Sequence, residues 1–347
     1  MSNHEPDTGR RRSSGERPLI AVTMGDPAGI GPEVTVKAAA REEARRCCRL
    51  LAVGDASILI AAQEMTDVPL AIHPIADVAH AEFRPSTLDV LDLDNVDVAA
   101  LAAGQVSAAA GRASVAYVRK AVELTQEGLV DGIATGPINK EALRAAGIPY
   151  IGHTELLAAL TGEERVTTML ATPGLRVVHV TRHVPLAEVA ALISKERVVE
   201  TLHITDRGLR QMGIREPRLA VAALNPHSGD GGLLGREEIE EIEPAVEEAR
   251  QEGIDARGPI PADSVFFQAI EGAFDAVVAM YHDQGHIPIK THDFARSVTV
   301  TLGLPIVRTS VDHGTAFEIA WRGKADETSM VEAIRLAGEL VAGRRAG

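Results

Sequence analysis

The chain has 347 residues, of which 45% are hydrophobic, and this is enough to form two domains with cores of their own. The formal net charge of -14 argues against nucleic acid or an anionic membrane as a partner. No apolar run approaches the roughly 20 residues that a membrane helix needs, and the amino end lacks the apolar core of a signal peptide. We therefore expect a cytoplasmic protein.

Short β-rich runs alternate with helical patterns along most of the chain, which is typical of an α/β protein with a largely parallel sheet. Residues 1–17 are polar and predict a disordered tail. The predicted strands cover residues 19–24, 50–54, 131–135, 166–171, 175–181, 218–224, 275–280 and 298–302. The predicted helices cover residues 33–46, 113–126, 195–212, 237–251 and 329–341.

A turn rich in glycine and proline, residues 23–33, joins the first strand to the first helix. Such a turn can bind an anion through free backbone N–H groups at the carboxyl edge of the sheet. It can equally be a tight connection without a ligand. The GxGxxG spacing of dinucleotide-binding turns is absent, so this segment alone does not decide between the two.

Three histidines follow the ends of three predicted strands: His183, His227 and His282. Because parallel strands place their carboxyl ends at one edge of a sheet, the three side chains can converge. Three neutral imidazoles with an open position form a divalent-metal site suited to catalysis. Asp283 is then a further ligand or an acceptor that fixes the tautomer of an imidazole.

Hydroxyl and cationic groups elsewhere suit a small phosphorylated acid, because charge-assisted hydrogen bonds bind phosphate. These groups are Thr154 next to His153, Lys290 and Arg308. Arg308 can instead form an internal ion pair, and Lys290 can be a solvated loop charge. Residues 225–232 form a glycine-rich loop after a strand, which is consistent with a backbone that closes over a substrate.

Eight motifs give the chain a specific resemblance. They are TMGDPAGIGPE at 23–33, GPINKEAL at 136–143, GHTELLA at 152–158, TRHVPL at 181–186, LNPHSGDGG at 224–232, PADSVF at 261–266, MYHDQG at 280–285 and RTSVDHGTAFEIA at 308–320. With these motifs the chain resembles the 4-hydroxythreonine-4-phosphate dehydrogenase family from Ile20 to about Leu340. That family oxidises a phosphorylated four-carbon acid with NAD.

The resemblance assigns one divalent ion, which can be Zn, Mg, Co or Mn, to the same three histidines. It also implies a homodimer with a shared active site, in which the metal site is completed by His282 of the partner subunit. By position, the resemblance assigns substrate binding to His153, Thr154, Lys290 and Arg308. The general base is left open, and the candidates are Lys290, Asp283 and His153.

More distantly, the first motif resembles the turn of isopropylmalate and isocitrate dehydrogenases, and residues 312–326 resemble their adenine-binding loop. The implied NAD contacts are His313, Gly314, Thr315, Ala316 and Asp326. The same resemblance implies two α/β domains with the active site in the cleft between them. The first would comprise residues 18–140 with 301–347, and the second, which also forms the dimer interface, residues 141–300.

Two positions bear on the substrate. Thr299 stands where the biosynthetic enzymes typically carry an asparagine that touches substrate, and His286 stands where many have leucine. The biosynthetic reaction is the first expectation: oxidation at C3 and decarboxylation of 4-phosphohydroxy-L-threonine to 3-amino-2-oxopropyl phosphate, for pyridoxal phosphate. The alternative is a sister branch that converts 4-phospho-D-threonate or 4-phospho-D-erythronate to dihydroxyacetone phosphate in sugar-acid breakdown.

A different class of enzyme also fits the three histidines. A metallohydrolase would use them to activate water and would need no nucleotide loop. Detection of bound or reduced NAD distinguishes this alternative from a dehydrogenase.

Overall fold

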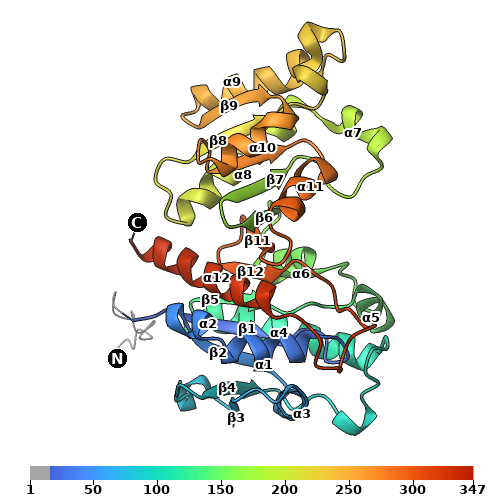
Figure 1. The fold of residues 1–347 in the computed structure, drawn as a ribbon, viewed down its shortest axis with the longest axis vertical. Helices are drawn as coiled ribbons and strands as arrows, with labels where there is room; N and C mark the ends of the chain where they lie inside the picture. The colour runs from blue at the N-terminus through green and yellow to red at the C-terminus, as the bar shows by residue number, and fades with distance from the viewer. Residues whose placement is uncertain (1–15, 347) are drawn as a thin grey trace, which may run out of the picture.

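The computed structural model describes residues 16–346, so the predicted tail lies outside the described residues except for Glu16 and Arg17. Within this range one sheet runs through the length of the molecule (Figure 1). Its 12 strands lie in the order β3-β4-β2-β1-β5-β12-β11-β6-β7-β10-β8-β9. The strands are β1 (Leu19–Thr23), β2 (Arg49–Gly54), β3 (Ala71–Ile75), β4 (Thr87–Asp92), β5 (Gly132–Thr135), β6 (Thr167–Thr172), β7 (Leu175–His179), β8 (Arg218–Ala222), β9 (Asp255–Ile260), β10 (Ala276–Ala279), β11 (Val298–Leu302) and β12 (Arg308–Val311).

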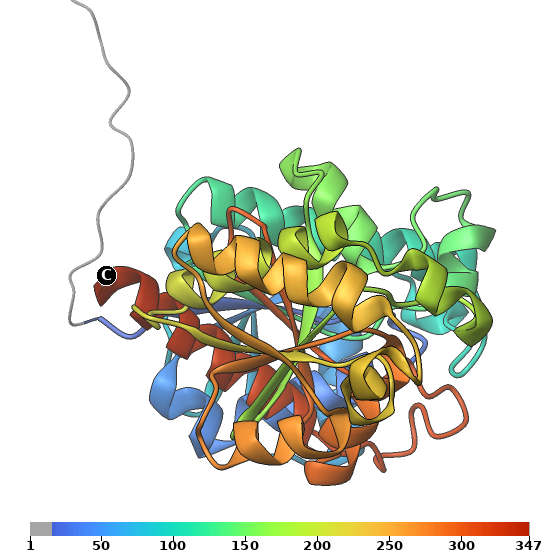
Figure 2. The same cartoon turned by 90° about the horizontal axis from the view of Figure 1, so that it is seen from above.

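Helices lie on both sides of this sheet when the molecule is seen from above (Figure 2). They are α1 (Gly31–Ala40), α2 (Glu42–Cys47), α3 (Ala56–Thr66), α4 (Ala108–Gln126), α5 (Lys140–Ala145), α6 (His153–Thr161), α7 (Leu186–Leu192), α8 (Lys195–Gln211), α9 (Glu243–Gln251), α10 (Ala262–Ile270), α11 (His282–His292) and α12 (Thr328–Ala346). The α/β prediction is therefore confirmed. Within residues 16–346, none of these helices combines the length and the apolar character required to cross a bilayer.

The sheet is largely parallel, as predicted, but its centre is not. The pairs β12–β11, β11–β6 and β6–β7 are antiparallel, and every other neighbouring pair is parallel. Three successive reversals mean that β7, β10 and β8 run opposite to β1, β5 and β12. The two halves of the sheet consequently point their carboxyl ends in opposite directions.

The sequence analysis did not predict four of the strands, which are β3, β4, β9 and β12. The two edge strands, β3 and β9, contain Pro74 and Pro259, and proline is tolerated in sheets at edges because no ladder N–H is needed there. In β4, Asp89 interrupts the apolar run, yet its buried carboxylate accepts hydrogen bonds from His73 and Phe83. Strand β12 has only four residues, three of them polar, so it shows no apolar run.

Two predicted helices are interrupted. The pattern over 33–46 is split at Arg41, which is extended, and this break lets α2 pack against α12. Gly338 of α12 makes the approach possible, because any side chain there would clash with the sulfur of Cys48. The pattern over 237–251 begins with a wide π-helical turn at Glu238–Ile242 before α9. Both interruptions depend on tertiary contacts that periodicity does not reveal.

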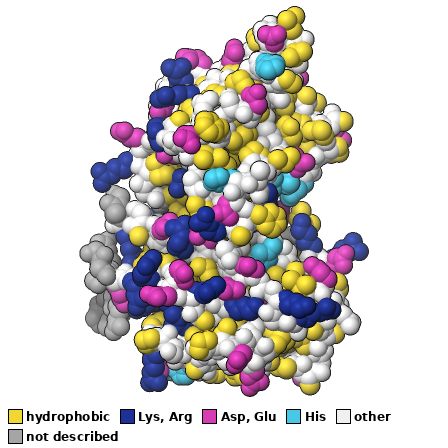
Figure 3. All heavy atoms as spheres, viewed as in Figure 1, with side chains coloured by type: hydrophobic (Ala, Val, Ile, Leu, Met, Phe, Trp, Pro, Cys, Tyr) yellow, Lys and Arg dark blue, Asp and Glu magenta, His cyan; other side chains and the backbone are white. Residues whose placement is uncertain are grey.

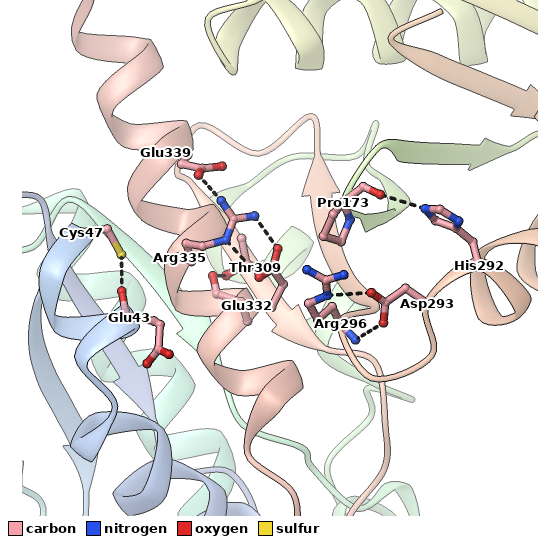
Figure 4. Close-up of polar contacts among 11 residues, drawn as sticks. Glu43, Cys47, Pro173, His292, Asp293, Arg296, Thr309, Glu332, Arg335 and Glu339 are labelled. Atoms are coloured by element: carbon pink, nitrogen blue, oxygen red, sulfur yellow. Dashed lines mark hydrogen bonds and ion pairs between the residues drawn. The ribbon is translucent and has the colours of Figure 1, made fainter. Parts of the chain in front are cut away.

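The long α12 lies across β5 and β12 and carries its own ion pairs (Figure 4). Arg335 lies between Glu332 and Glu339, one turn away on either side, and its Nε donates to Glu332 at 2.9 Å. Figure 4 also shows the segment that leads from α11 to β11. There His292 contacts the carbonyl oxygen of Pro173 at 3.0 Å, which anchors the carboxyl end of α11 at the β6–β7 turn.

Candidate active site

The three predicted metal ligands follow the neighbouring parallel strands β7, β10 and β8, as the sequence indicated. The ring centres of His183 and His282 are 5.7 Å apart. His227 is exposed on the loop after β8. Across residues 16–346, no three His, Cys, Asp or Glu side chains gather closely enough to hold a metal ion. One chain therefore brings two of the three predicted ligands together.

The loop that carries His227 has an unusual backbone. Each residue from His227 to Gly232 has a positive φ, including the non-glycine residues His227, Ser228 and Asp230. Such conformations are costly and persist only where surrounding contacts impose them. Here the buried carboxylate of Glu238 accepts hydrogen bonds from the backbone N–H groups of Leu224 and Asn225, at 2.9 and 2.7 Å. Glu238 thus fixes the start of the loop.

Two further histidines lie beside His282. The ring of His286 stacks on that of His282 with a centre-to-centre distance of 3.5 Å, and the ring of His179 lies 4.8 Å from His286. Burial, with smaller contributions from the neighbouring histidines, lowers the pKa of His179 to about 3. His179 is therefore neutral, and its buried Nε2 has no hydrogen-bond partner in the described part of the chain. Gly285 allows this packing, since a side chain there would clash with His179.

Helix α11 brings together side chains that are up to eight positions apart in the sequence. His282, His286 and Lys290 recur at intervals of four and share one face of the helix. The Nδ1 atom of His282 lies 2.7 Å from a carboxylate oxygen of Asp283, an arrangement that fixes the ring and leaves Nε2 available as a ligand. At the other end, the Lys290 ammonium forms an ion pair with Asp312, which also accepts a 2.8 Å hydrogen bond from Ser297.

Two adjoining cavities lie along this face. The larger, of about 600 Å³, is bordered by the histidine cluster and by β6 and β11, and its lining includes Thr154, Thr299, His183 and His282 from the predicted site. The smaller, of about 280 Å³, is lined by Lys290, His313 and Asp326, among others. Asp312 borders both cavities. In the space-filling view, histidine side chains are visible at mid-height between the two halves of the molecule (Figure 3).

Arg308 is the most deeply buried of the predicted substrate residues, with 3% of its surface exposed. It donates to the hydroxyls of Thr301 and Thr135 at 2.9 and 2.6 Å, and none of residues 16–346 offers it a carboxylate partner. Burial lowers the pKa of Arg308 to about 9. Burial and the nearby Arg308 also hold the pKa of His153 well below its usual range, and the His153 Nε2 is buried without a partner.

Three N–H groups of the glycine-rich turn are bonded within the chain itself. Ala28 donates to the Asp26 carboxylate at 2.8 Å, Gly29 donates to the Asp26 carbonyl at 3.0 Å, and Ile30 donates to the Thr315 carbonyl at 3.0 Å. The whole turn is buried. These contacts favour the tight connection among the two interpretations that the sequence left open, and the partner of the turn is the predicted cofactor loop.

The contacts between α1 and that loop are extensive. The buried Glu33 accepts from the backbone N–H groups of Arg322 and Ala325, and Lys37 donates to the carbonyls of Gly323 and Ala325 at 2.8 and 2.7 Å. Gly29 must be glycine, because an added Cβ would lie 2.9 Å from the side chain of Thr315. The motif at 23–33 and Lys37 of α1 therefore hold residues 312–326 in position through these contacts.

Sequence reasoning missed several residues of the larger cavity, notably His179, Arg182 and Thr168. His179 and Arg182 lie within five residues of a predicted metal ligand, but a buried histidine at a strand end is usually structural. Thr168 faces the cavity only because β6 pairs with β11, and no local pattern could show this.

A family comparison places the chain among known proteins. The family model of the pyridoxal phosphate biosynthetic protein PdxA matches residues 46–337. A protein of Symbiobacterium thermophilum with the provisional name D-threonate 4-phosphate dehydrogenase is 50% identical over 329 residues, which are 95% of this chain and 98% of that protein. A Fusobacterium nucleatum protein with the same provisional name is 48% identical, over 92% of this chain and 96% of its own length.

Solved structures agree with this placement. A 4-hydroxythreonine-4-phosphate dehydrogenase from Klebsiella pneumoniae is 45% identical and superposes with a TM-score of 0.88, covering 95% of this chain and 99% of that chain. A terephthalate 1,2-cis-dihydrodiol dehydrogenase from Burkholderia xenovorans is 32% identical, with a TM-score of 0.65, over 93% of this chain and 98% of that one.

Proposed function

Because the chain belongs to the PdxA family of dehydrogenases, we propose that it oxidises the C3 alcohol of a 4-phosphorylated four-carbon acid with NAD and a divalent metal ion. The 3-keto acid formed in this step then loses its carboxylate as carbon dioxide. The observation that carries the proposal is the cavity of about 600 Å³, which has the candidate metal ligands His183 and His282 at one side and the hydroxyls of Thr154, Thr168 and Thr299 at the other.

The donor set fits a divalent ion. Burial lowers the pKa of His183 below its usual value, and Asp283 orients the ring of His282. When bound, the ion supplies Lewis acidity toward the alcohol, and NAD supplies the hydride acceptor. The ion can be Zn, Mg, Co or Mn, since neutral imidazoles bind several of these metals.

Substrate anions are assigned to the opposite wall. Arg308 is a buried cation without a carboxylate partner, and burying such a group is costly unless an anion joins it. Arg308 is linked to β11 by its hydrogen bond to Thr301, and Thr154 and Thr299 line the larger cavity. We assign Thr154, Thr299, Arg308 and His153 to substrate binding.

Of the three candidate bases, Lys290 has the best position. It is held by Asp312, which borders both the substrate cavity and the cofactor cavity, and as a neutral amine it would accept the proton of a substrate hydroxyl there. Asp283 is exposed and already engaged with His282, and the buried Nε2 of His153 lies behind Thr154 in the first turn of α6.

We assign the nicotinamide cofactor to the smaller cavity and the loop over residues 312–326. His313 and Asp326 line the cavity, and the loop is rigidly supported by α1 through Glu33 and Lys37. Gly314, Thr315 and Ala316 complete the proposed contacts. The two domains predicted from the sequence are supported by the strand order, since β1 to β5 with β12 are contiguous and β6 to β11 are contiguous.

We propose that the metal site is shared between two copies of the chain, so that His282 of the partner subunit joins His183 and His227. Leu186 and Ile287 are 71% and 62% exposed beside His183 and His282, and they line a third cavity of about 570 Å³. A second subunit that covers this apolar surface would bring its own His282 toward the first chain. Mixed dimers of His183→Ala and His282→Ala proteins should then recover about half of the wild-type sites. Absence of recovery in demonstrated mixed dimers would contradict a shared site.

For the substrate, we favour 4-phospho-D-threonate, because relatives at 50% and 48% identity carry a name for that activity. The second candidate is 4-phosphohydroxy-L-threonine, named for solved structures at 45% identity. The decisive experiment is a panel of phosphorylated four-carbon acids assayed for NADH formation with and without a chelator. Turnover that persists in chelator, or hydrolysis without NADH, would overturn the proposal and, in the second case, favour a metallohydrolase.

A further inference from the structure

We propose that Arg182 is an additional substrate-binding residue, which holds an oxyanion of the substrate at the side of the larger cavity next to the metal histidines. This inference rests on the proposed function, because it assumes that the cavity receives a phosphorylated acid. It assigns a role to a residue that lies directly before His183 in the chain and directly beside the reaction site in space.

The position of Arg182 separates it from ordinary surface arginines. It is half-buried and borders both the cavity of about 600 Å³ and the neighbouring one of about 570 Å³. Its Nη1 donates to the hydroxyl of Thr168 at 3.3 Å. Nowhere in residues 16–346 does a carboxylate lie within ion-pair distance of it, although Glu155 is close enough to influence its pKa, which burial lowers.

A row of hydroxyls connects Arg182 to the substrate residues already proposed. The hydroxyl of Thr168 lies 3.5 Å from that of Thr154. Thr168 of β6 is paired with Thr301 of β11, and paired residues on neighbouring antiparallel strands place their side chains on the same face, about 5 Å apart. Thr301 in turn accepts the hydrogen bond from Arg308. The guanidinium groups of Arg182 and Arg308 thus lie at the two ends of this row of hydroxyls.

The substrate anions need a free cation at the larger cavity, and neither Lys290 nor Arg308 supplies it. Lys290 is neutralised by its ion pair with Asp312. Arg308 has both terminal nitrogens engaged by Thr135 and Thr301 and does not border the larger cavity. An acid that carries both a carboxylate and a phosphate presents two oxyanions. Arg182, with a planar guanidinium open to the cavity, fits one of them.

The test compares Arg182→Gln with Arg197→Gln. Arg197 borders the same cavity from α8, but it is exposed and donates to the Leu192 carbonyl, so its removal takes one positive charge from the rim without touching the hydroxyl row. We expect Arg182→Gln to raise KM for the phosphorylated acid by about tenfold or more and to leave KM for NAD unchanged. Arg197→Gln should change both constants less than about twofold. Equal effects of the two substitutions would overturn the inference.

Two probes identify the group that is bound, and they do not require turnover. D-threonate carries the carboxylate without phosphate, and glycerol 3-phosphate carries phosphate without a carboxylate. Binding of each to wild type and to Arg182→Gln is measured by calorimetry with the metal-loaded protein. Loss of affinity for one probe assigns Arg182 to that group, whereas unchanged affinity for both would refute the proposal.

The outcomes separate this inference from the function on which it rests. If wild-type protein oxidises none of the phosphorylated acids, the proposed function fails, while the binding measurement still tests Arg182. If wild type turns over and Arg182→Gln matches it, the inference alone fails. Should Arg182→Gln not fold, Arg182→Lys keeps the charge without the planar fork and must still raise KM for the acid selectively.

Discussion

The glycine-rich turn after β1 and the histidine cluster after β7 and β10 use their polar groups in opposite ways. In the turn, the N–H groups of Ala28, Gly29 and Ile30 are all accepted by the chain itself. In the cluster and the adjoining wall, polar atoms of His153, His179 and Arg308 are buried without partners. The more conspicuous sequence motif thus satisfies these N–H groups itself, whereas the candidate site keeps polar atoms without partners.

The reason for this difference is energetic. A buried polar atom without a partner costs about 1 to 3 kcal/mol, so a chain keeps several of them together only where something else meets them. A turn that satisfies its own hydrogen bonds has nothing left for a ligand. Unsatisfied polar atoms, which no sequence pattern displays, locate the site better than glycine content does.

The largest expected effect is the loss of a metal ligand. His282→Ala should reduce kcat by more than about a hundredfold, because even partners that only orient a metal-bound histidine are worth about ten- to a hundredfold. Metal content, measured by elemental analysis, should fall in parallel. The control is His203→Ala, which removes an exposed histidine paired with Glu252 on the far α8–α9 surface and should retain turnover. Full activity of His282→Ala in chelator would remove the metal from the mechanism.

The second effect concerns Asp26, whose side chain is an exception to this contrast because one of its buried oxygens has no partner. The Asp26 side chain is fully buried, its second oxygen has no partner, and burial raises its pKa to about 6. The folded protein therefore binds a proton there more tightly than the unfolded chain does. The protonated carboxyl therefore adds to the free energy of unfolding below about pH 4, and this contribution is lost as the pH rises through about 6. For a pKa shift of roughly two units, the loss is up to about 3 kcal/mol.

Asp26→Asn tests this assignment, because asparagine can accept from Ala28 but cannot ionise. The variant should be more stable than wild type at neutral pH, and the difference should shrink as the pH falls toward about 4. Urea denaturation across this range measures it. Asp55→Asn is the matched control: both Asp55 oxygens accept backbone hydrogen bonds, so that substitution should destabilise at neutral pH. A wild-type advantage at neutral pH over Asp26→Asn would contradict the raised pKa.

The third effect tests whether the turn acts through the cofactor loop. Glu33→Gln replaces one carboxylate oxygen with an amide that faces a backbone N–H, so the loop over 322–325 should loosen. We expect KM for NAD to rise about three- to tenfold and KM for the acid to stay constant. Arg41→Gln removes an exposed ion pair with Glu327 beyond the loop and should change neither constant. A rise in KM for the acid alone would show that the turn serves the substrate.

The sequence predicted the fold class, and it predicted that His183, His227 and His282 follow strand ends, because both depend on local patterns. Strand ends can be located from apolar runs, and the spacing of four residues between His282, His286 and Lys290 is present in the sequence itself. The support of the cofactor loop was not predictable: Lys37 and Gly323 are 286 residues apart. Thr168 likewise reaches the cavity through the pairing of β6 with β11, and the antiparallel pairing of two strands so far apart in the sequence has no local signature.

The smallest effect concerns the choice of substrate. Thr299 lines the larger cavity, and it lies on the same face of β11 as Thr301 because the two are separated by one residue. An amide at this position reaches farther than the hydroxyl and offers a donor and an acceptor at once. Thr299→Asn should therefore change the ratio of kcat/KM for 4-phosphohydroxy-L-threonine to that for 4-phospho-D-threonate by about three- to tenfold, the value of one hydrogen bond to the C2 substituent. Thr299→Val is the matched control, since it keeps the shape and removes all hydrogen bonding, and it should lower activity on both acids without favouring either. If both activities are retained in Thr299→Asn and their ratio stays constant, residue 299 does not distinguish an amine from a hydroxyl at C2. The next residue to test would then be His286, which lines the same cavity from α11.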